Sequence, residues 1–324
     1  MASFRDFGND LYSGKRSINV VGKRKVWYLV ALVVVVLAAL LPTVRGGFNF
    51  GIEFRGGSEF RLTTAQPSAE QIAVDGVRQI LPEAQVSVTR VGASDIRIQT
   101  GQLSDEDSEA VRVELAERFE IQPAEVASSF IGPNWGADVT NQALTGLFVF
   151  LALVALLMAL YFRSWKMSVA ALIALAHDLI ITIGIYGAVG FEVTPAAVIG
   201  FLTILSYSLY DTVVVFDKVR ENTQEIEFSE TRTFGEQVNL AVNQTLVRSI
   251  NTSVVAVLPT AAILFIGSLI LGAGTLRDIS LALFVGTIVG TYSSVFLAGP
   301  IYAHLREKEP KLAAAAEKVM ASRV

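Results

Sequence analysis

Six long segments of the chain are almost free of charged side chains, and they constrain its fold more than any other feature. They cover residues 26–44, 143–162, 167–191, 193–216, 249–276 and 279–303. A membrane-spanning helix needs roughly 20 mostly apolar residues. The sequence therefore predicts an α-helical membrane protein with six spans. The first segment is longer than the apolar core of a signal peptide, and no A-x-A cleavage site follows it, so we expect it to be retained.

The composition fits this class and argues against others. Charged residues make up 17% of the 324 residues, against about 25% in typical soluble domains. The net charge of −4 gives no basic patch for nucleic acid. No cysteine is present and there are only two histidines, so thiolate chemistry is excluded and no metal site is expected. Phosphate-binding and protease motifs are also missing. We expect a non-enzyme without a cofactor, driven by an ion gradient or by a partner.

Basic residues predict the orientation in the membrane. Lys and Arg gather in residues 1–25, in the turn after the second span, in the loop after the fourth span and in the C-terminal tail. Such residues mark cytoplasmic flanks. The predicted order is a cytoplasmic tail (1–25), a first span (26–44), an external soluble domain (45–141), helices two to six (142–304) and a cytoplasmic tail (305–324). This order places both termini in the cytoplasm.

The external block has the pattern of a small α+β domain. Alternating apolar residues predict strands over 58–64, 85–91, 95–100 and 125–131. Helical spacing predicts one helix over 69–81 and a second after Ser104, which has the features of an N-cap. The order β-α-β-β-α-β is that of a ferredoxin-like fold.

Charged residues within the spans are the strongest functional signal. His177 and Asp178 lie in the third span, Asp211 in the fourth, and Arg248 at the start of the fifth. Intramembrane charges usually face a protein interior or a water-filled path. We expect Asp211 and Arg248 to lie at similar depth and to pair. The supporting polar residues are Tyr207, Ser208, Thr212, Asn251 and Thr252. Two interpretations remain open: a proton relay, or a structural pin between helices.

Several motifs resemble those of the SecF family of bacterial protein-export subunits. FGIEFRGG at 50–57 is similar to its G-I-D-F-x-G-G signature, and IGPNWG at 131–136 to its V-G-P-x-x-G signature. The segment 207–222 resembles the family hallmark of the fourth span, 248–253 that of the fifth, and 176–178 the pattern of the third. The signature residues are Gly51, Glu53, Gly56, Gly57, Gly132 and Pro133. Two positions depart from the pattern: Glu53 replaces a frequent Asp, and Tyr210 a frequent Asn.

The resemblance implies half of an RND-type transporter in the bacterial cytoplasmic membrane. It implies SecD as partner, association with the SecYEG channel and YidC, contact with lipid, and an unfolded exported polypeptide as client. Asp211 and Arg248 match the positions that the family uses in proton conduction, and His177 and Asp178 join the candidate relay. A lone half-transporter should expose a partner surface, expected on the small-residue face of the sixth span and the charged faces of the third and fourth. The alternatives are a non-conducting assembly subunit and an RND-like small-molecule exporter.

Overall fold

The computed structural model describes residues 4–91, 94–224, 226, 231–267 and 274–323. Six of its helical segments are long and apolar enough to cross a membrane, which confirms the predicted fold class. Four are single helices: α2 (Arg24–Val44), α6 (Pro133–Phe162), α7 (Trp165–Val189) and α8 (Pro195–Thr223). The fifth joins α9 (Phe234–Ala262) to the π-helix η3 (Ile263–Gly267). The sixth joins α10 (Gly274–Ser293), the π-helix η4 (Ser294–Ala298) and α11 (Gly299–Arg306).

The fifth spanning segment begins earlier than its apolar stretch predicts. The helical spacing of Val238, Ala241 and Val242 predicts a short interfacial helix from Phe234 that leads into the span from 249, whereas the structure has one helix, α9, without a break from Phe234. Thr233 and Glu236 form a capping box that fixes this start. The first turns of α9 also bury Phe234, Val238 and Val242, so they pack into the bundle and do not lie at its edge.

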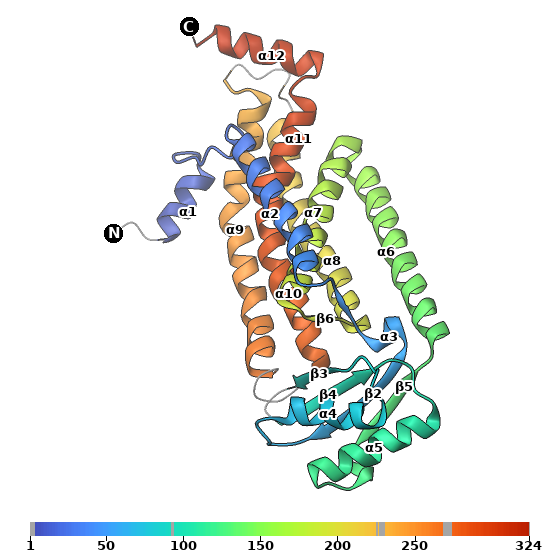
Figure 1. Ribbon diagram of the computed structural model, residues 1–324. Coiled ribbons are helices and arrows are strands. Elements are labelled where there is room, and N and C mark those ends of the chain that lie inside the picture. Colours follow the sequence, from blue (N-terminus) through green and yellow to red (C-terminus); the bar gives the residue numbers. More distant parts are fainter. Residues whose placement is uncertain (1–3, 92–93, 225, 227–230, 268–273, 324) are drawn as a thin grey trace.

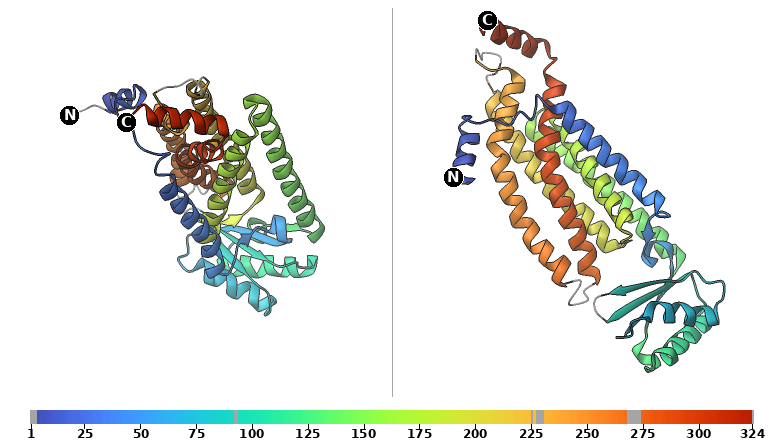
Figure 2. Two further views of the ribbon diagram at one scale, coloured as in Figure 1. Left: turned by 90° about the horizontal axis from the view of Figure 1, so that it is seen from above. Right: turned by 60° about the vertical axis from the view of Figure 1, so that its left-hand side comes forward.

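One small domain lies at the end of the helical bundle opposite to the two termini (Figures 1 and 2). This sheet domain contains β2 (Gly57–Thr63), α4 (Ala69–Ile80), β3 (Ser87–Val91), β4 (Asp95–Thr100), α5 (Asp105–Phe119), the 3₁₀ turn η1 (Pro123–Glu125) and β5 (Ala127–Ile131). The strands form an antiparallel sheet in the order β3-β4-β2-β5. Order and topology match the predicted ferredoxin-like arrangement.

One face of this sheet carries the core of the domain. Phe60, Ile96 and Ile98 are fully buried against Val77 of α4 and Leu115 of α5. The predicted N-cap is confirmed, since the backbone N–H of Asp107 donates to Ser104 Oγ at 3.0 Å. The opposite face of the sheet is polar and turns toward the spanning helices.

A short junction links the sheet domain to the bundle. The strand β1 (Asn49–Phe50) pairs in parallel with β6 (Glu192–Val193), which lies between α7 and α8. The single turn α3 (Ile52–Arg55) follows and packs on the start of α6. Gly57 has φ 143°, and a Cβ there would collide with the carbonyl oxygen of Thr100. The glycine at this position therefore allows the backbone at the start of β2 to pass close to the backbone of Thr100.

Glycines also let the spanning helices approach each other. Gly184 and Gly187 of α7 face Ala38 and Pro42 of α2. Gly286 and Gly290 of α10 face Ile204 and Ser208 of α8. The small-residue face of the sixth span is therefore covered within the chain, and our prediction that it forms a partner surface was wrong. The buried side chains of the third and fourth spans face inward in the same way.

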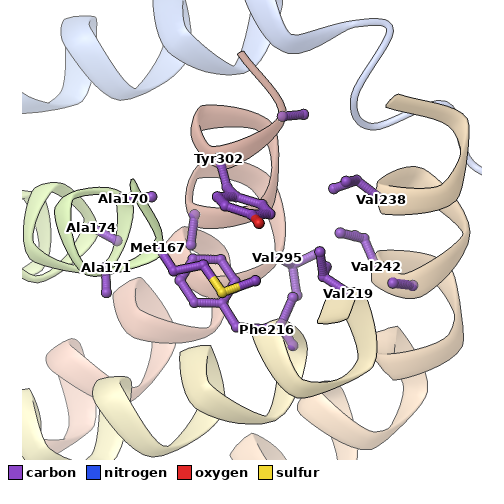
Figure 3. Packing of buried hydrophobic residues seen from close by; sticks show 14 of the residues in the cluster. Met167, Ala170, Ala171, Ala174, Phe216, Val219, Val238, Val242, Val295 and Tyr302 are labelled. Atoms are coloured by element: carbon purple, nitrogen blue, oxygen red, sulfur yellow. The ribbon is translucent and has the colours of Figure 1, made fainter. Parts of the chain in front are cut away.

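The end of the bundle near the termini has a dense apolar core. Figure 3 shows Met167 and Ala170 of α7 facing Phe216 of α8, Val242 of α9 and Tyr302 of α11. Two helices outside the spans, α1 (Phe4–Tyr12) and α12 (Pro310–Ala321), lie at this end. The segment between α1 and α2 is held by α9, where the side-chain oxygen of Asn239 accepts from the backbone N–H groups of Val20 and Val21.

Candidate functional site

Asp178 is the centre of a polar cluster inside the bundle. Its side chain is completely buried on α7. Ser208 of α8 donates to Asp178 Oδ2 at 2.5 Å, and Ser293 of α10 donates to the same oxygen at 2.7 Å. His177 Nδ1 lies 3.0 Å from the other oxygen, Oδ1. Each oxygen of Asp178 therefore has a partner, and three spanning helices meet at one carboxyl group.

The helix geometry explains how three helices come this close. A Cβ at Gly290 would lie only 3.0 Å from the Cβ of Ser208, so glycine lets α10 approach α8. The π-helix η4 begins directly after Ser293. Ser294, its first residue, donates to the carbonyl oxygen of Gly290 at 2.8 Å, and its Oγ lies 3.1 Å from Thr212 Oγ1 of α8. Single π-turns of this kind are frequent at functional sites.

Asp211 lies on the same helix as Ser208, three residues further along. It is 5% exposed, and Ser249 of α9 donates to its Oδ1 at 2.8 Å. Its second oxygen, Oδ2, is buried and has no hydrogen-bond partner among the described residues. A buried polar atom without a partner calls for an explanation, since most such atoms are satisfied. The two buried carboxyl groups thus differ, because both oxygens of Asp178 have partners and one oxygen of Asp211 has none among the described residues.

Arg248 does not pair with Asp211 as we expected. Its side chain is exposed and donates to the hydroxyl of Tyr210 at 3.4 Å, and the described ion pairs include none between Arg248 and Asp211. Neighbouring residues of a helix point about 100° apart. Because Ser249 faces α8, Arg248 is turned outward. Arg248 contacts Tyr210, which directly precedes Asp211 on α8.

The other expected polar residues divide between the outside and the inside of the bundle, with Asn251 and Thr252 on α9 and the rest on α8. Asn251 is exposed, and Thr252 donates to the backbone carbonyl of Arg248 at 2.8 Å. Neither contacts the buried cluster. Tyr207 reaches it at its margin, where its hydroxyl donates to Ser253 Oγ at 3.4 Å. Ser208 and Thr212 are fully inside it.

Several hydroxyl residues of the cluster were not predicted. They are Ser249, Ser253, Thr291, Ser293 and Ser294, and all are buried or half-buried. Serine and threonine are common in spanning helices because they bond to their own backbone, so composition gives no signal. The i, i+4 spacing of Ser249 and Ser253 was a usable signal, since it places two hydroxyl groups on one face.

His177 joins the cluster to an aromatic group. Its ring centroid lies 5.9 Å from that of Tyr292, which stacks on Phe296 at 5.5 Å. The hydroxyl of Tyr292 donates to the backbone carbonyl of Trp27 on α2. The second ring nitrogen of His177, Nε2, is buried without a partner among the described residues. The histidine therefore lies between Asp178 and the first span.

The signature residues lie elsewhere, at the junction with the sheet domain. Gly51 precedes α3, Gly56 and Gly57 lead into β2, Gly132 is the N-cap of α6 and Pro133 is its first residue. Glu53 is half-buried, and its Oε2 has no described partner. Burial raises the pKa of Glu53 above its usual value, and the nearby carboxylates Glu192 and Glu59 raise it further. Within the described residues, no three metal-ligating side chains converge.

Comparison with known proteins identifies the family. Residues 111–308 match the family described as protein export membrane protein SecD/SecF, C-terminal, and residues 45–68 match the SecD/SecF GG motif. The chain belongs to the SecD/SecF family. The protein translocase subunit SecF of Streptomyces coelicolor is 42% identical over 323 residues, which cover all of this chain and 86% of that protein. The SecF subunit of Mycobacterium tuberculosis is 41% identical and matches 93% of this chain and 70% of its own length.

Solved structures of SecDF have the same fold. The crystal structure of SecDF from Thermus thermophilus, a translocon-associated membrane protein, matches with a TM-score of 0.77 and 32% identity. It covers 90% of this chain, which spans 39% of the SecDF chain. SecDF in a super-membrane-facing form matches with a TM-score of 0.63 and 31% identity, over 95% of this chain and 40% of the other. The chain is thus a multi-pass membrane protein of the SecF type, with a transport role.

Proposed function

We propose that the chain works with SecD to promote the late translocation of polypeptide, driven by the proton gradient. The family membership supports this role, as does the Thermus thermophilus SecDF relative, which is 34% identical over 87% of this chain and 38% of its own length. In the proposal both termini are cytoplasmic, and residues 45–141 lie outside the bacterial cytoplasmic membrane. The SecYEG channel and YidC are the proposed further partners, and an unfolded exported polypeptide is the client.

Asp211 is the proton-exchanging residue in this proposal. The observation that carries it is the unpartnered Oδ2, because a proton can bind there without displacing any donor. Asp178 differs, since Ser208, Ser293 and His177 occupy its oxygens. A proton on Asp178 would join a carboxyl group that already has three polar neighbours. Asp178 and His177 therefore link α7 to α8 and α10 beside Asp211.

Arg248 acts at the partner surface. An uncompensated charge within a span costs on the order of 2.5–3.5 kcal/mol on insertion scales. Tyr210 of α8 is exposed beside it, Thr203 and Ser206 are exposed on the same face of α8 as Tyr210, and Asn251 of α9 is exposed three residues after Arg248. This polar stripe fits a protein neighbour better than lipid, so we propose that SecD covers it. Arg248 would then approach Asp211 only when the packing against SecD changes.

The decisive experiment measures proton flux through the SecD–SecF complex in proteoliposomes. Asp211→Asn keeps the size of the side chain but cannot release a proton. We expect the variant to assemble with SecD, to reduce proton flux to the level of empty liposomes and to abolish gradient-stimulated export. Asp217→Asn is the matched control, because Asp217 lies on the same helix but is exposed. Full proton flux in an assembled Asp211→Asn complex would refute the relay.

A non-conducting assembly subunit is the second candidate. The saturated hydrogen bonding of Asp178 favours it, since such a network is what a structural pin requires. An RND-like small-molecule exporter is less well supported. The cavity of about 500 Å³ beside the sheet domain has a mixed lining, in which the charged residues Arg61, Asp95, Arg97, Glu125 and Asp278 stand beside apolar ones such as Leu62 and Ile96. A pocket for a small apolar substrate is expected to be lined mostly by apolar side chains.

A further inference from the structure

The sheet domain is attached to the spanning helices by a network of charged and polar side chains. Arg97 of β4 forms an ion pair with Glu192, the first residue of β6 between α7 and α8. Gln99 of the same strand donates to Glu192 Oε1 at 2.6 Å and to Glu59 Oε2 of β2 at 3.0 Å. The side chains of Arg97 and Glu192 are only 15% and 12% exposed. The polar face of the sheet therefore binds the connection between α7 and α8.

A second set of bonds ties the ends of three spanning helices together at the same level. Asp278, near the start of α10, accepts a hydrogen bond at Oδ2 from Thr194 Oγ1 at 2.9 Å. Thr194 is also the N-cap of α8, where its side chain accepts from the backbone N–H of Ala197. Tyr186, near the end of α7, donates to the backbone carbonyl of Asp278. The guanidinium of Arg277 lies 4.1 Å from the ring centre of Phe191.

The junction also depends on a close approach of backbone to carboxylate. A Cβ on Gly51 would collide with Glu53 Oε2 and lie 3.1 Å from Glu192 Oε1. A side chain at position 51 would therefore have to displace the Glu53 carboxylate from its place beside the β1–β6 pair. The GG-motif segment and the α7–α8 connection thus meet where the Glu53 and Glu192 carboxylates lie close to Gly51.

The helices that meet in this network are those that carry the buried relay. Asp178 lies on α7, Ser208 and Asp211 on α8, and Ser293 on α10. A displacement of α8 relative to α7 or α10 at the relay changes the geometry of Thr194, Asp278 and Glu192 at the helix ends. We propose that Arg97, Glu192 and Asp278 are positioning residues, which form a joint that transmits helix movement at the relay to the sheet domain. This inference rests on the proposed function.

The joint predicts that conduction and export can be separated. Glu192→Gln and Arg97→Gln each break the ion pair but leave the relay residues unchanged. In the complete SecD–SecF complex, reconstituted with the SecYEG channel, we expect gradient-stimulated export to fall at least about fivefold, the lower range of site-to-site coupling. Proton flux should persist. The matched control is Arg112→Gln, which breaks the exposed Arg112–Glu109 pair within α5 and should leave both quantities unchanged.

Exchange of the two charges provides the second test. Arg97→Glu combined with Glu192→Arg restores an ion pair of opposite direction, so export should recover relative to either single charge reversal. Size-exclusion chromatography of each variant with SecD shows whether the variant still assembles, and so whether it folds. Normal gradient-stimulated export by an assembled Glu192→Gln complex overturns the joint, as does a double variant no better than the single ones. Failure of the proposed function looks different, because there Asp211→Asn leaves both flux and export intact.

Discussion

At the scale of single residues, two neighbours on α9 have different roles because their side chains point about 100° apart around the helix. Ser249 donates to Asp211 inside the bundle, and its neighbour Arg248 points outward to Tyr210. The sequence identified the charged residues at this depth because charges are rare within spans. It could not show which side of α9 each residue occupies, since that depends on how α9 packs against α8. Ser208 and Thr212 were predicted, but Ser249, Ser293 and Ser294 were missed for the same reason.

Glu53 provides a test at the residue scale through the pH dependence of stability. Its pKa is raised in the folded protein, mainly by burial. The folded state therefore holds this proton more tightly than the unfolded state does, and the stabilisation is fully present below the unfolded pKa. It is lost as the pH rises through the folded pKa, where the carboxylate becomes charged beside Glu192 and Glu59.

Glu53→Gln, which is neutral at every pH, should therefore raise the melting temperature of the purified protein at pH 7 to 8. The difference from the unchanged protein should shrink as the pH is lowered toward the ordinary glutamate range. Glu117→Gln is the control, because Glu117 is an exposed carboxylate of α5. A melting-temperature difference that stays constant with pH, or that grows in acid, would contradict this account.

At the scale of helices and strands, local patterns predicted the elements well and their ends less well. The strands of the sheet domain alternate apolar and polar residues, so their bounds were predicted within about three residues. A helix was predicted from Phe234, but as a short interfacial helix before a span from residue 249, because its first turns are polar on one side. The structure shows one continuous helix, which the capping box at Thr233 and Glu236 begins.

The packing of α10 on α8 gives a prediction at this scale. A Cβ on Gly286 would collide with the side chain of Ile204, which is fully buried. Gly286→Ala should therefore destabilise the protein by about 1–3 kcal/mol, the usual cost of overpacking a core. The measurement is thermal unfolding in detergent. Gly146→Ala on α6 is the control, since a Cβ there meets no atom within 4 Å, and equal melting temperatures for both variants would contradict the packing argument.

At the scale of the whole molecule, the sequence predicted both parts but not their attachment. The six spans and the sheet domain are each encoded in local periodicity. The joint between them is not, because Arg97 and Glu192 are 95 positions apart and neither lies in a motif. The sheet domain also lies at the end of the bundle opposite to the termini (Figure 1). Because the two ends of the molecule lie on opposite sides of the bundle, labelling one residue at each end can determine the orientation of the chain in the membrane.

The sequence contains no cysteine, so a thiol label found on this chain must lie on an introduced residue. Ser129 of β5 and Ser322 after α12 are both exposed, at opposite ends of the molecule. Basic residues near the termini predict that this end is cytoplasmic. A membrane-impermeant maleimide applied to intact cells should therefore label the Ser129→Cys variant. The Ser322→Cys variant should react only after the membrane is permeabilised. Labelling of Ser322→Cys in intact cells would reverse the proposed topology and place the sheet domain on the wrong side to hold an exported polypeptide.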